Sequence, residues 1–386
     1  MPSNFARING LNVVSIKPME AAEPLQQVRR TYIRYRNQLL TYFGGCDYFR
    51  LASHPAIHAA VRTGLQRYGL NVAASRVTTG NHEVYRQLEQ DLARFFQAEA
   101  ALLTNSGYVT NLVVGQTLAG HYSHALIDER AHVALVDAAN VLNCPVLKFK
   151  HRDVESFAAT LKRCGPAARP VVLTDGMYAQ NGSVAPLATY LKILPRDGFI
   201  IVDDAHGAGT LGATGRGAIE IEGVDRRRIV QNITFSKAFG VYGGAILCSK
   251  ALRKKLTASR LFVGSTPLPL PLAFAARSAV QLLRTDKTIR AKLNRNSEYI
   301  KTRLRIVGFP LPDFPGPIVP VHLATPRANE ALRRALFAAK ILPPFLRYPG
   351  SPAHGYFRFV ISSEHTLAQL NLLARTLEPF GKMLAD

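Results

Sequence analysis

The sequence has no tryptophan, only four cysteines and only 26 acidic residues in a chain of 386. The cysteines are far apart and form no CxxC pair: Cys46, Cys144, Cys164 and Cys248. Their spacing excludes a disulfide scaffold, argues against a zinc or other metal site, and favours buried thiols in a reducing, cytoplasmic environment. No apolar run reaches the roughly 18 residues of a membrane span. The first residues also lack the uninterrupted apolar run of a signal peptide.

The chain is rich in apolar and basic residues instead. Apolar residues make up 47% of it, which is enough for a sizeable core, so intrinsic disorder is excluded. The 48 Lys and Arg exceed the acidic residues and give a net charge of +22. A charge of this size predicts a polyanionic partner, substrate or surface without identifying it. Nucleic acid is the least favoured of these, because there is no helix-turn-helix, zinc finger or aromatic RNA-binding signature.

Short β-branched runs alternate with longer amphipathic runs in the first two thirds of the chain. Strands are predicted at 100–107, 124–129, 145–150, 169–176, 199–207, 229–237 and 242–250, with helices at 88–99, 154–164 and 187–194. This alternation is typical of an α/β fold with a mostly parallel sheet covered on both faces. In such sheets the functional groups lie at the carboxyl ends of the strands.

The regular alternation stops at both ends of the chain. We therefore divide the chain into an N-terminal helical arm (1–45), a large domain (46–272) and a small C-terminal α+β domain (273–386). The arm rests on segment 20–45, which is predicted as a helix ending at a pair of glycines. The second boundary follows three prolines between 267 and 271. After them a single long basic helix is predicted to about residue 306.

Ionisable side chains follow two of the predicted strands. Asp203, Asp204 and His206 end one strand, and a buried carboxylate there would pair with a cationic ring nitrogen. Alone, this segment is equally well explained as a polar strand end. The next strand ends at Lys237, whose amine becomes nucleophilic when burial lowers its pKa. An aspartate, a histidine and a lysine on adjacent strand ends resemble a pyridoxal phosphate site.

Two further segments would complete such a site. Ser106, Gly107 and Tyr108 lie between a predicted strand and a helix, where free N–H groups and the helix dipole favour a phosphate. The same triplet is more often only a strand–helix turn. His132 follows another strand and could stack on a cofactor ring. A single histidine is usually structural, so its role depends on the other residues.

With these residues the chain resembles the α-oxoamine synthases, a family of fold-type-I pyridoxal phosphate enzymes. The family includes 8-amino-7-oxononanoate synthase, serine palmitoyltransferase, 5-aminolevulinate synthase and 2-amino-3-ketobutyrate ligase. The motifs that carry the resemblance cover most of the chain: CDYFRLASHP (46–55), SRVTTGNHEVYRQLEQDLARFF (75–96), TNSGYVTN (104–111), DERAHVALVDAA (128–139), TDGMYAQNGSVAPL (174–187), VDDAHGAGTLGATGRG (202–217), TFSKAFGVYGGAI (234–246) and GSTPLPLP (264–271). Each motif is weak alone, but their order and spacing are specific.

The resemblance implies a role for each matching residue. Lys237 would carry the cofactor, Asp203 would pair with its ring nitrogen, His206 would contact its phenolic oxygen and His132 would stack on its ring. Lys237, His132 and His206 would take part in catalysis.

Further matching residues would hold the cofactor phosphate and imply a subunit partner. Gly107, Tyr108 and Thr234 would lie about the cofactor and its phosphate. Ser265 or Thr266 would reach the phosphate of a neighbouring subunit, so the resemblance implies a homodimer with a shared active site.

The activity that the family resemblance implies is a decarboxylative Claisen condensation. An amino acid, held by the carboxylate-binding Arg358, would react with an acyl thioester of coenzyme A or of an acyl carrier protein. The product would be a 2-amino ketone. His132 would donate a hydrogen bond to the thioester carbonyl or to the carboxylate.

Two alternatives stay open at this point. An aminotransferase or amino acid lyase of the same fold would share Lys237 and Asp203 without requiring His132. A binding or regulatory protein could keep the fold alone, but the complete set of cofactor residues argues against it. Six positions depart from residues common in the family: Ala73, Ala74, Ala179, Asn181, Leu342 and Phe345. They concern the choice of substrates more than the cofactor.

The positive charge is concentrated in one segment. Between Lys250 and Arg305 there are fourteen Lys and Arg against two acidic residues, so 12 of the net 22 charges lie there. Many recur three or four positions apart and can share a helical face. The simplest interpretation is a solvated helix. A sharper hypothesis is electrostatic docking of an acidic acyl carrier protein or of the phosphates of coenzyme A.

Overall fold

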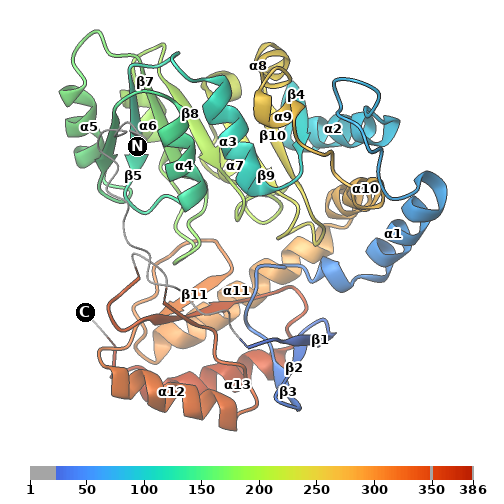
Figure 1. Ribbon diagram of the computed structural model, residues 1–386. Coiled ribbons are helices and arrows are strands. Elements are labelled where there is room, and N and C mark those ends of the chain that lie inside the picture. Colours follow the sequence, from blue (N-terminus) through green and yellow to red (C-terminus); the bar gives the residue numbers. More distant parts are fainter. Residues whose placement is uncertain (1–22, 348–350, 385–386) are drawn as a thin grey trace, which may run out of the picture.

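The computed structural model describes residues 23–347 and 351–384. These residues form two lobes, a large α/β lobe and a smaller α+β lobe (Figure 1). The large lobe is built on a seven-stranded sheet of order β4-β10-β9-β8-β7-β5-β6. Only β10 runs antiparallel to its neighbours, so the predicted mostly parallel sheet is confirmed.

The strands of this sheet coincide with the predicted apolar runs. They are β4 (Ala100–Thr104), β5 (His124–Asp128), β6 (Val146–Phe149), β7 (Pro170–Asp175), β8 (Phe199–Asp203), β9 (Ile229–Thr234) and β10 (Gly244–Cys248). Five of them, β4 and β7 to β10, are buried or nearly so along their whole length. Burial on both faces explains why their sequences are continuous apolar runs rather than alternating ones.

Helices cover both faces of the sheet. One face packs against α1 (Pro55–Tyr68), α2 (Glu83–Phe96), α5 (Val154–Arg163), α6 (Leu187–Ile193), α7 (Ala218–Ile221) and α10 (Leu270–Thr285). The other packs against α3 (Gly107–Thr117), α4 (Val133–Val141), α8 (Lys250–Leu256) and α9 (Arg260–Val263). Successive strand residues alternate between the two cores, Leu102 with the second and Leu103 with the first.

The small lobe has a three-stranded antiparallel sheet of order β11-β13-β12. Its elements are β11 (Ile318–Val321), β12 (Phe345–Leu346), β13 (Tyr356–Val360), α11 (Lys287–Ile306), α12 (Pro326–Ala338) and α13 (Leu367–Leu377). Its core joins Ile300 of α11 to Leu332, Phe359 and Leu373 on the other elements. The small α+β domain predicted for this part of the chain is thus present.

The predicted N-terminal helix is wrong where the structure describes it. Residues 26–41 form a small antiparallel sheet of β1 (Gln26–Arg29), β2 (Tyr32–Tyr35) and β3 (Gln38–Thr41). Arg36 and Asn37 both have positive φ, 45° and 60°, as a two-residue hairpin turn with the twist of the strands requires. Thr41 N also donates to Lys340 O at 2.7 Å, which attaches the sheet to the small lobe. Turn chemistry and tertiary contacts outweigh helix propensity here. Residues 1–22 of the proposed arm lie outside the described residues.

The predicted long basic helix is in fact two helices. They meet at Asp286, whose Oδ1 accepts a hydrogen bond from Thr288 N at 2.9 Å and caps α11. Helix α10 packs in the core of the large lobe, and so does Leu293 of α11, whereas Ile300 packs in the small lobe. The contacts therefore divide the lobes within α11, which passes from one to the other in Figure 1, rather than at residue 272.

All four cysteine thiols are free. Cys248 is buried, as expected, whereas the other three are only half-buried. Within residues 23–347 and 351–384 no helix is both long and apolar enough to cross a membrane.

The turn after β9 requires glycine. Gly240 has φ +62°, and a Cβ there would lie 2.3 Å from Ala52 N. We expect Gly240→Ala to lower the stability by about 3 kcal/mol, because it combines left-handed backbone strain with a backbone clash. Gly120→Ala is the matched control, since Gly120 has φ +72° and open space around it, and it should cost about 1 kcal/mol. Equal losses in urea unfolding would contradict the close approach.

Candidate active site

The candidate site lies where parallel strands of the large sheet end. Asp175 ends β7, Asp203 ends β8 and Thr234 ends β9. These strands are adjacent and parallel, so their carboxyl ends meet at one edge of the sheet. This placement agrees with the edge expected for Asp203 and for Lys237, which follows β9.

Asp203 is a buried carboxylate whose two oxygens each accept a hydrogen bond. Oδ2 accepts from Asn111 Nδ2 at 2.7 Å, and Oδ1 accepts from Ala205 N at 3.1 Å. Asn111 is held in turn, because its Oδ1 accepts from Asn232 Nδ2 at 2.8 Å. The carboxylate is therefore fixed in direction and still has lone pairs for one more donor.

Lys237 lies in a tight turn, where Gly240 N donates to its carbonyl at 3.0 Å. No acceptor among the described residues holds its amine, and the side chain is half-buried. Desolvation lowers the pKa of Lys237, while electrostatic interactions with Cys46 and Asp203 act in the opposite direction. An amine that is desolvated and free of hydrogen bonds can act as a nucleophile or a base.

His132 caps α4 with its imidazole. Nδ1 accepts from Ala134 N at 3.2 Å, and the backbone N–H of His132 donates to Asp175 Oδ2 at 2.8 Å. Partial desolvation and the Lys237 charge lower the pKa of His132, although Asp203 opposes the shift. Since Nδ1 is an acceptor, the neutral ring carries its proton on Nε2, which is free to donate. Burial and the Asp203 charge raise the pKa of Asp175 well above its usual value.

His206 is buried beside Tyr48. The distance between Tyr48 Oη and His206 Nδ1 is 2.6 Å. Desolvation, followed by the positive charges of Lys237 and Arg358, lowers the pKa of His206 well below its usual value. The imidazole is therefore neutral, and the tyrosine fixes its orientation.

The segment from Ser106 to Tyr108 forms the N-terminus of α3. Ser106 Oγ accepts from Val109 N at 3.3 Å and caps the helix. A Cβ on Gly107 would lie 2.7 Å from Thr234 Cβ, so only glycine permits this approach to β9. The Tyr108 hydroxyl donates to Asp137, and its ring lies edge-on to His132 with centroids 6.4 Å apart. Gly107, Tyr108, Thr234 and His132 are thus neighbours.

Arg358 extends from β13 of the small lobe to the large lobe. Its Nη1 donates to Ala179 O at 3.3 Å, and its Nη2 lies 4.0 Å from Cys46 Sγ. Ala179 therefore contributes its carbonyl rather than its side chain. Asn181 accepts from Ser183 N at 3.0 Å and closes a turn.

Leu342 and Phe345, which also depart from residues common in the family, lie in the small lobe. Leu342 N donates to Thr41 O at 3.0 Å, which helps to attach the N-terminal sheet. The Phe345 ring packs against Phe357 with centroids 5.0 Å apart.

Ser265 and Thr266 are not brought to Lys237 or Asp203 by any contact recorded within the described residues. The Ser265 hydroxyl donates to Leu261 O, and Thr266 is exposed. Both line a small cavity together with Asn105.

Four residues of the site were not singled out from the sequence. Asp175 ends β7, and the strand-end rule that identified Asp203 would also have identified it. Asn111 lies one turn after Gly107 in α3 and contacts Asp203 only because of the fold. Cys46 and Tyr48 belong to the motif CDYFRLASHP (46–55). Only the tertiary structure brings Cys46 to Arg358 and Tyr48 to His206.

Asp204 lies behind the site and is fully buried. Its Oδ2 accepts from Gln231 Nε2 at 2.6 Å and from Ala218 N at 2.9 Å. Desolvation raises the pKa of this carboxyl to about 7, although both hydrogen bonds oppose the shift.

Comparisons with known proteins agree with this geometry. Residues 44–377 match the model of the aminotransferase class I and II family. The 8-amino-7-oxononanoate synthase of Thioalkalivibrio sulfidiphilus is 34% identical over 338 residues, which is 86% of each chain. The serine palmitoyltransferase structure of Sphingomonas wittichii has a TM-score of 0.86 at 26% identity and covers 92% of this chain and 91% of its own. A serine palmitoyltransferase variant from S. paucimobilis, with PLP and myriocin bound, has the same TM-score and coverage at 25% identity.

The raised pKa of Asp204 predicts a pH-dependent stability. The folded protein keeps a proton that the unfolded chain, with the ordinary pKa of 3.8, releases. This contribution is present below pH 3.8 and is lost as the pH rises through about 7. Asp204→Asn keeps the acceptor oxygen without the titration. We therefore expect the melting temperature of the wild type to fall relative to Asp204→Asn between pH 5 and pH 8. A constant difference would contradict the buried titration.

Proposed function

Because this chain belongs to the class I and II aminotransferase family, and within it to the α-oxoamine synthases, we propose that it condenses a small amino acid with an acyl thioester. In this reaction a carbon–carbon bond forms between the amino acid α carbon and the acyl carbon. The amino acid loses its carboxylate as CO₂, and the acyl donor leaves as a free thiol. The product is a 2-amino ketone.

The described residues fit the family cofactor, pyridoxal phosphate. Lys237 offers a free, desolvated amine for the cofactor aldehyde, and Asp203 offers lone pairs to a ring N–H. Gly107 lies close to Thr234 and has no side chain. The backbone N–H groups at the N-terminus of α3 could therefore bind the cofactor phosphate. His132 would stack on the ring, and His206 would contact its phenolic oxygen. When bound, the cofactor supplies a ring that stabilises negative charge at the amino acid α carbon.

The residues of this chain would position the amino acid and move its proton. Arg358 would bind the substrate carboxylate through its guanidinium fork. Lys237 Nζ would take the α proton, since its lowered pKa leaves a larger fraction of neutral amine. The Nε2–H of His132 would donate to the thioester carbonyl, because Nδ1 is occupied by Ala134 N. The observation that carries the proposal is that Lys237, Asp203 and Arg358 converge from both lobes.

We also propose that two chains form a homodimer. Apolar side chains are exposed on neighbouring segments of the large lobe: Leu65 at 50%, Leu70 at 62%, Val77 at 47%, Tyr242 at 52% and Val263 at 37%. Two hydrogen bonds link the segments of Leu70, Val77 and Val263 to neighbouring parts of the lobe: Ser75 Oγ donates to Val263 O at 2.7 Å, and Leu270 N donates to Leu70 O at 3.0 Å. Exposed apolar side chains gathered in this way favour an interface. Thr266, or Ser265 beside it, would then reach the partner's phosphate.

An acidic acyl carrier protein is the donor that the surface charge favours. The fourteen basic residues of segment 250–305 are distributed over α8 to α11, and Arg290 and Lys301 are buried. Arg284, Lys292 and Arg295 are exposed on α10 and α11. Beneath them Arg290 Nε donates to Ala213 O at 3.4 Å, in the segment that follows His206. We propose that this exposed group steers the carrier toward the site.

The condensation predicts that CO₂ and free thiol are released only when a small amino acid and an acyl thioester are both present. We expect Lys237→Ala to lower the rate by roughly 10³-fold, because its amine takes the α proton. Arg358→Lys, which keeps the charge but loses the fork, should mainly raise the KM for the amino acid. Formation of a 2-oxo acid from the amino acid would instead identify an aminotransferase.

Reversal of the surface charges tests the donor. We expect Arg284→Glu, Lys292→Glu and Arg295→Glu together to raise the apparent KM for an acyl carrier protein donor by about tenfold at low salt. The increase should shrink as salt screens the charges. The matched control is Lys250→Glu, Lys254→Glu and Lys255→Glu on α8, an equal change of charge elsewhere. Equal KM values for the two triple variants would reject docking at this group.

A further inference from the structure

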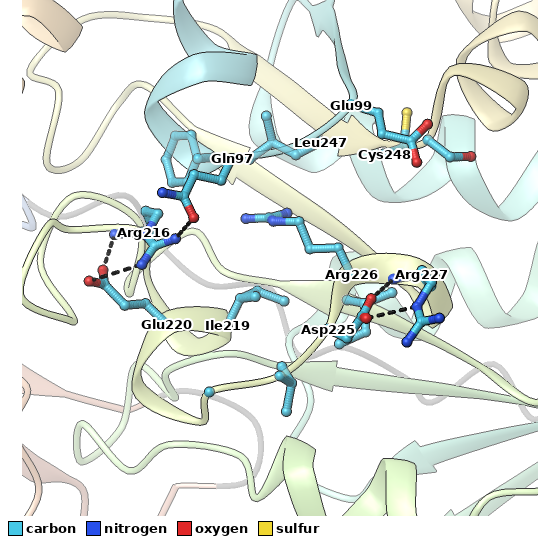
Figure 2. Close-up of a pocket in the computed structure, with 15 residues that line it drawn as sticks. Gln97, Glu99, Arg216, Ile219, Glu220, Asp225, Arg226, Arg227, Leu247 and Cys248 are labelled. Carbon is cyan, nitrogen blue, oxygen red and sulfur yellow. Dashed lines mark hydrogen bonds and ion pairs between the residues drawn. The ribbon is translucent and has the colours of Figure 1, made fainter.

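A second cavity lies at the opposite edge of the large sheet from Lys237. Its volume is about 460 Å³, and it is lined by residues where β9 begins, at Ile229, and where β10 ends, at Cys248 (Figure 2). Lys237 follows the other end of β9, so these strands separate the cavity from the candidate active site. A volume of this size lies within the range of small-molecule sites in proteins.

The acidic side chains of the cavity wall already have partners. Glu220 Oε2 accepts from Arg216 N at 2.9 Å, and Arg216 also pairs with Glu220 through its guanidinium at 3.5 Å. Asp225 is paired with Arg227 at 2.7 Å. Glu99 accepts from the first backbone N–H of α8 at 3.1 Å. These carboxylates are therefore engaged by groups other than Arg226.

Arg226, in the 3₁₀ turn η2 (Arg226–Arg228), forms no ion pair with a carboxylate of the described residues. Its Nη2 donates to Gln231 Oε1 at 2.6 Å, and its Nη1 is buried with no acceptor among the described residues. Figure 2 shows its side chain extended across the cavity toward Gln97 and Arg216. Desolvation lowers the pKa of Arg226 to about 10, with Asp204 opposing the shift and Arg216 adding to it. The guanidinium is thus a largely buried cation whose charge is poorly compensated.

We propose that this cavity binds a small organic anion, with a carboxylate or phosphate group beside Arg226. An oxyanion there would accept hydrogen bonds from the guanidinium and neutralise its charge. The rest of the ligand would pack against the apolar part of the wall, where Ile219, Val224 and Leu247 lie. Such a ligand would bind separately from the substrates, because it occupies the other edge of the sheet.

The cavity is also connected to the candidate active site by hydrogen bonds. Gln231 accepts from Arg226 and donates to Asp204 Oδ2 at 2.6 Å, and Asp204 directly follows Asp203. An anion at Arg226 therefore acts on the same side-chain network that lies behind the cofactor-pairing aspartate.

Calorimetric titration of the holoenzyme with hexanoate tests the site. We expect saturable binding, and a loss of affinity of about tenfold or more in Arg226→Gln, because a charged hydrogen-bond donor is removed. Arg163→Gln is the matched control, since Arg163 is exposed on α5 and has no ion pair recorded within the described residues. Val224→Phe, which places a larger apolar side chain in the cavity wall and keeps Arg226, should weaken binding in the same way.

Further titrations identify which chemical group is bound and at which site. Uncharged hexanamide should bind much more weakly than hexanoate. Titration with inorganic phosphate shows whether an oxyanion binds without an apolar chain attached to it. Arg358→Ala should keep hexanoate binding, because Arg358 belongs to the other site. Equal affinities in Arg226→Gln and Arg163→Gln, or loss of binding in Arg358→Ala alone, would overturn the proposal. Neither result depends on whether the enzyme performs the proposed condensation.

Discussion

The carboxyl ends of β8 and β9 bring the buried Asp203 and the half-buried Lys237 together, and much of the surrounding structure serves to make this possible. Asp203 is held by Asn111 and by a backbone N–H, and its charge acts on Lys237. Burial, and after it the charge of Asp203, raises the pKa of Asp175 well above the usual value. Two carboxyl groups this close cannot easily both ionise in a buried environment. The raised pKa of Asp175 therefore favours its protonated form beside Asp203.

The two lobes contribute unequal parts to the site. The large lobe carries Lys237, Asp203, His132 and His206 on the ends of adjacent elements, which the sheet holds rigidly. Arg358 extends from the small lobe, and its guanidinium donates to the carbonyl of Ala179. A motion of the lobes along α11, which belongs to both cores, would move Arg358 relative to the other groups. The large lobe thus holds the groups proposed for the chemistry, and the small lobe holds the guanidinium proposed to bind the amino acid.

The sequence predicted the sheet more accurately than the ends of the chain. Each predicted strand of the large lobe is present, because strands buried on both faces need continuous apolar residues that are easily recognised. The N-terminal helix was wrong because the turn at Arg36 and Asn37 and the contact of Thr41 with the small lobe decide that segment. The long basic helix was divided because a single aspartate ends one helix and caps the next. These outcomes depend on local turn chemistry and on partners distant in sequence.

The residue types and their order along the chain determined the fold class and the family, and they indicated the residues that we propose for the chemistry. Strand-end positions follow from a periodicity of apolar residues that can be read directly, and the chemistry of lysine, aspartate and histidine follows from their side chains. The tertiary structure alone decided which groups meet: Tyr48 with His206, Cys46 with Arg358, and Asn111 with Asp203. It also decided that Arg226 faces a cavity and that its buried Nη1 has no acceptor in the part of the chain that the structure describes. Burial and charge compensation depend on contacts between distant segments, and no local pattern in a single sequence records them.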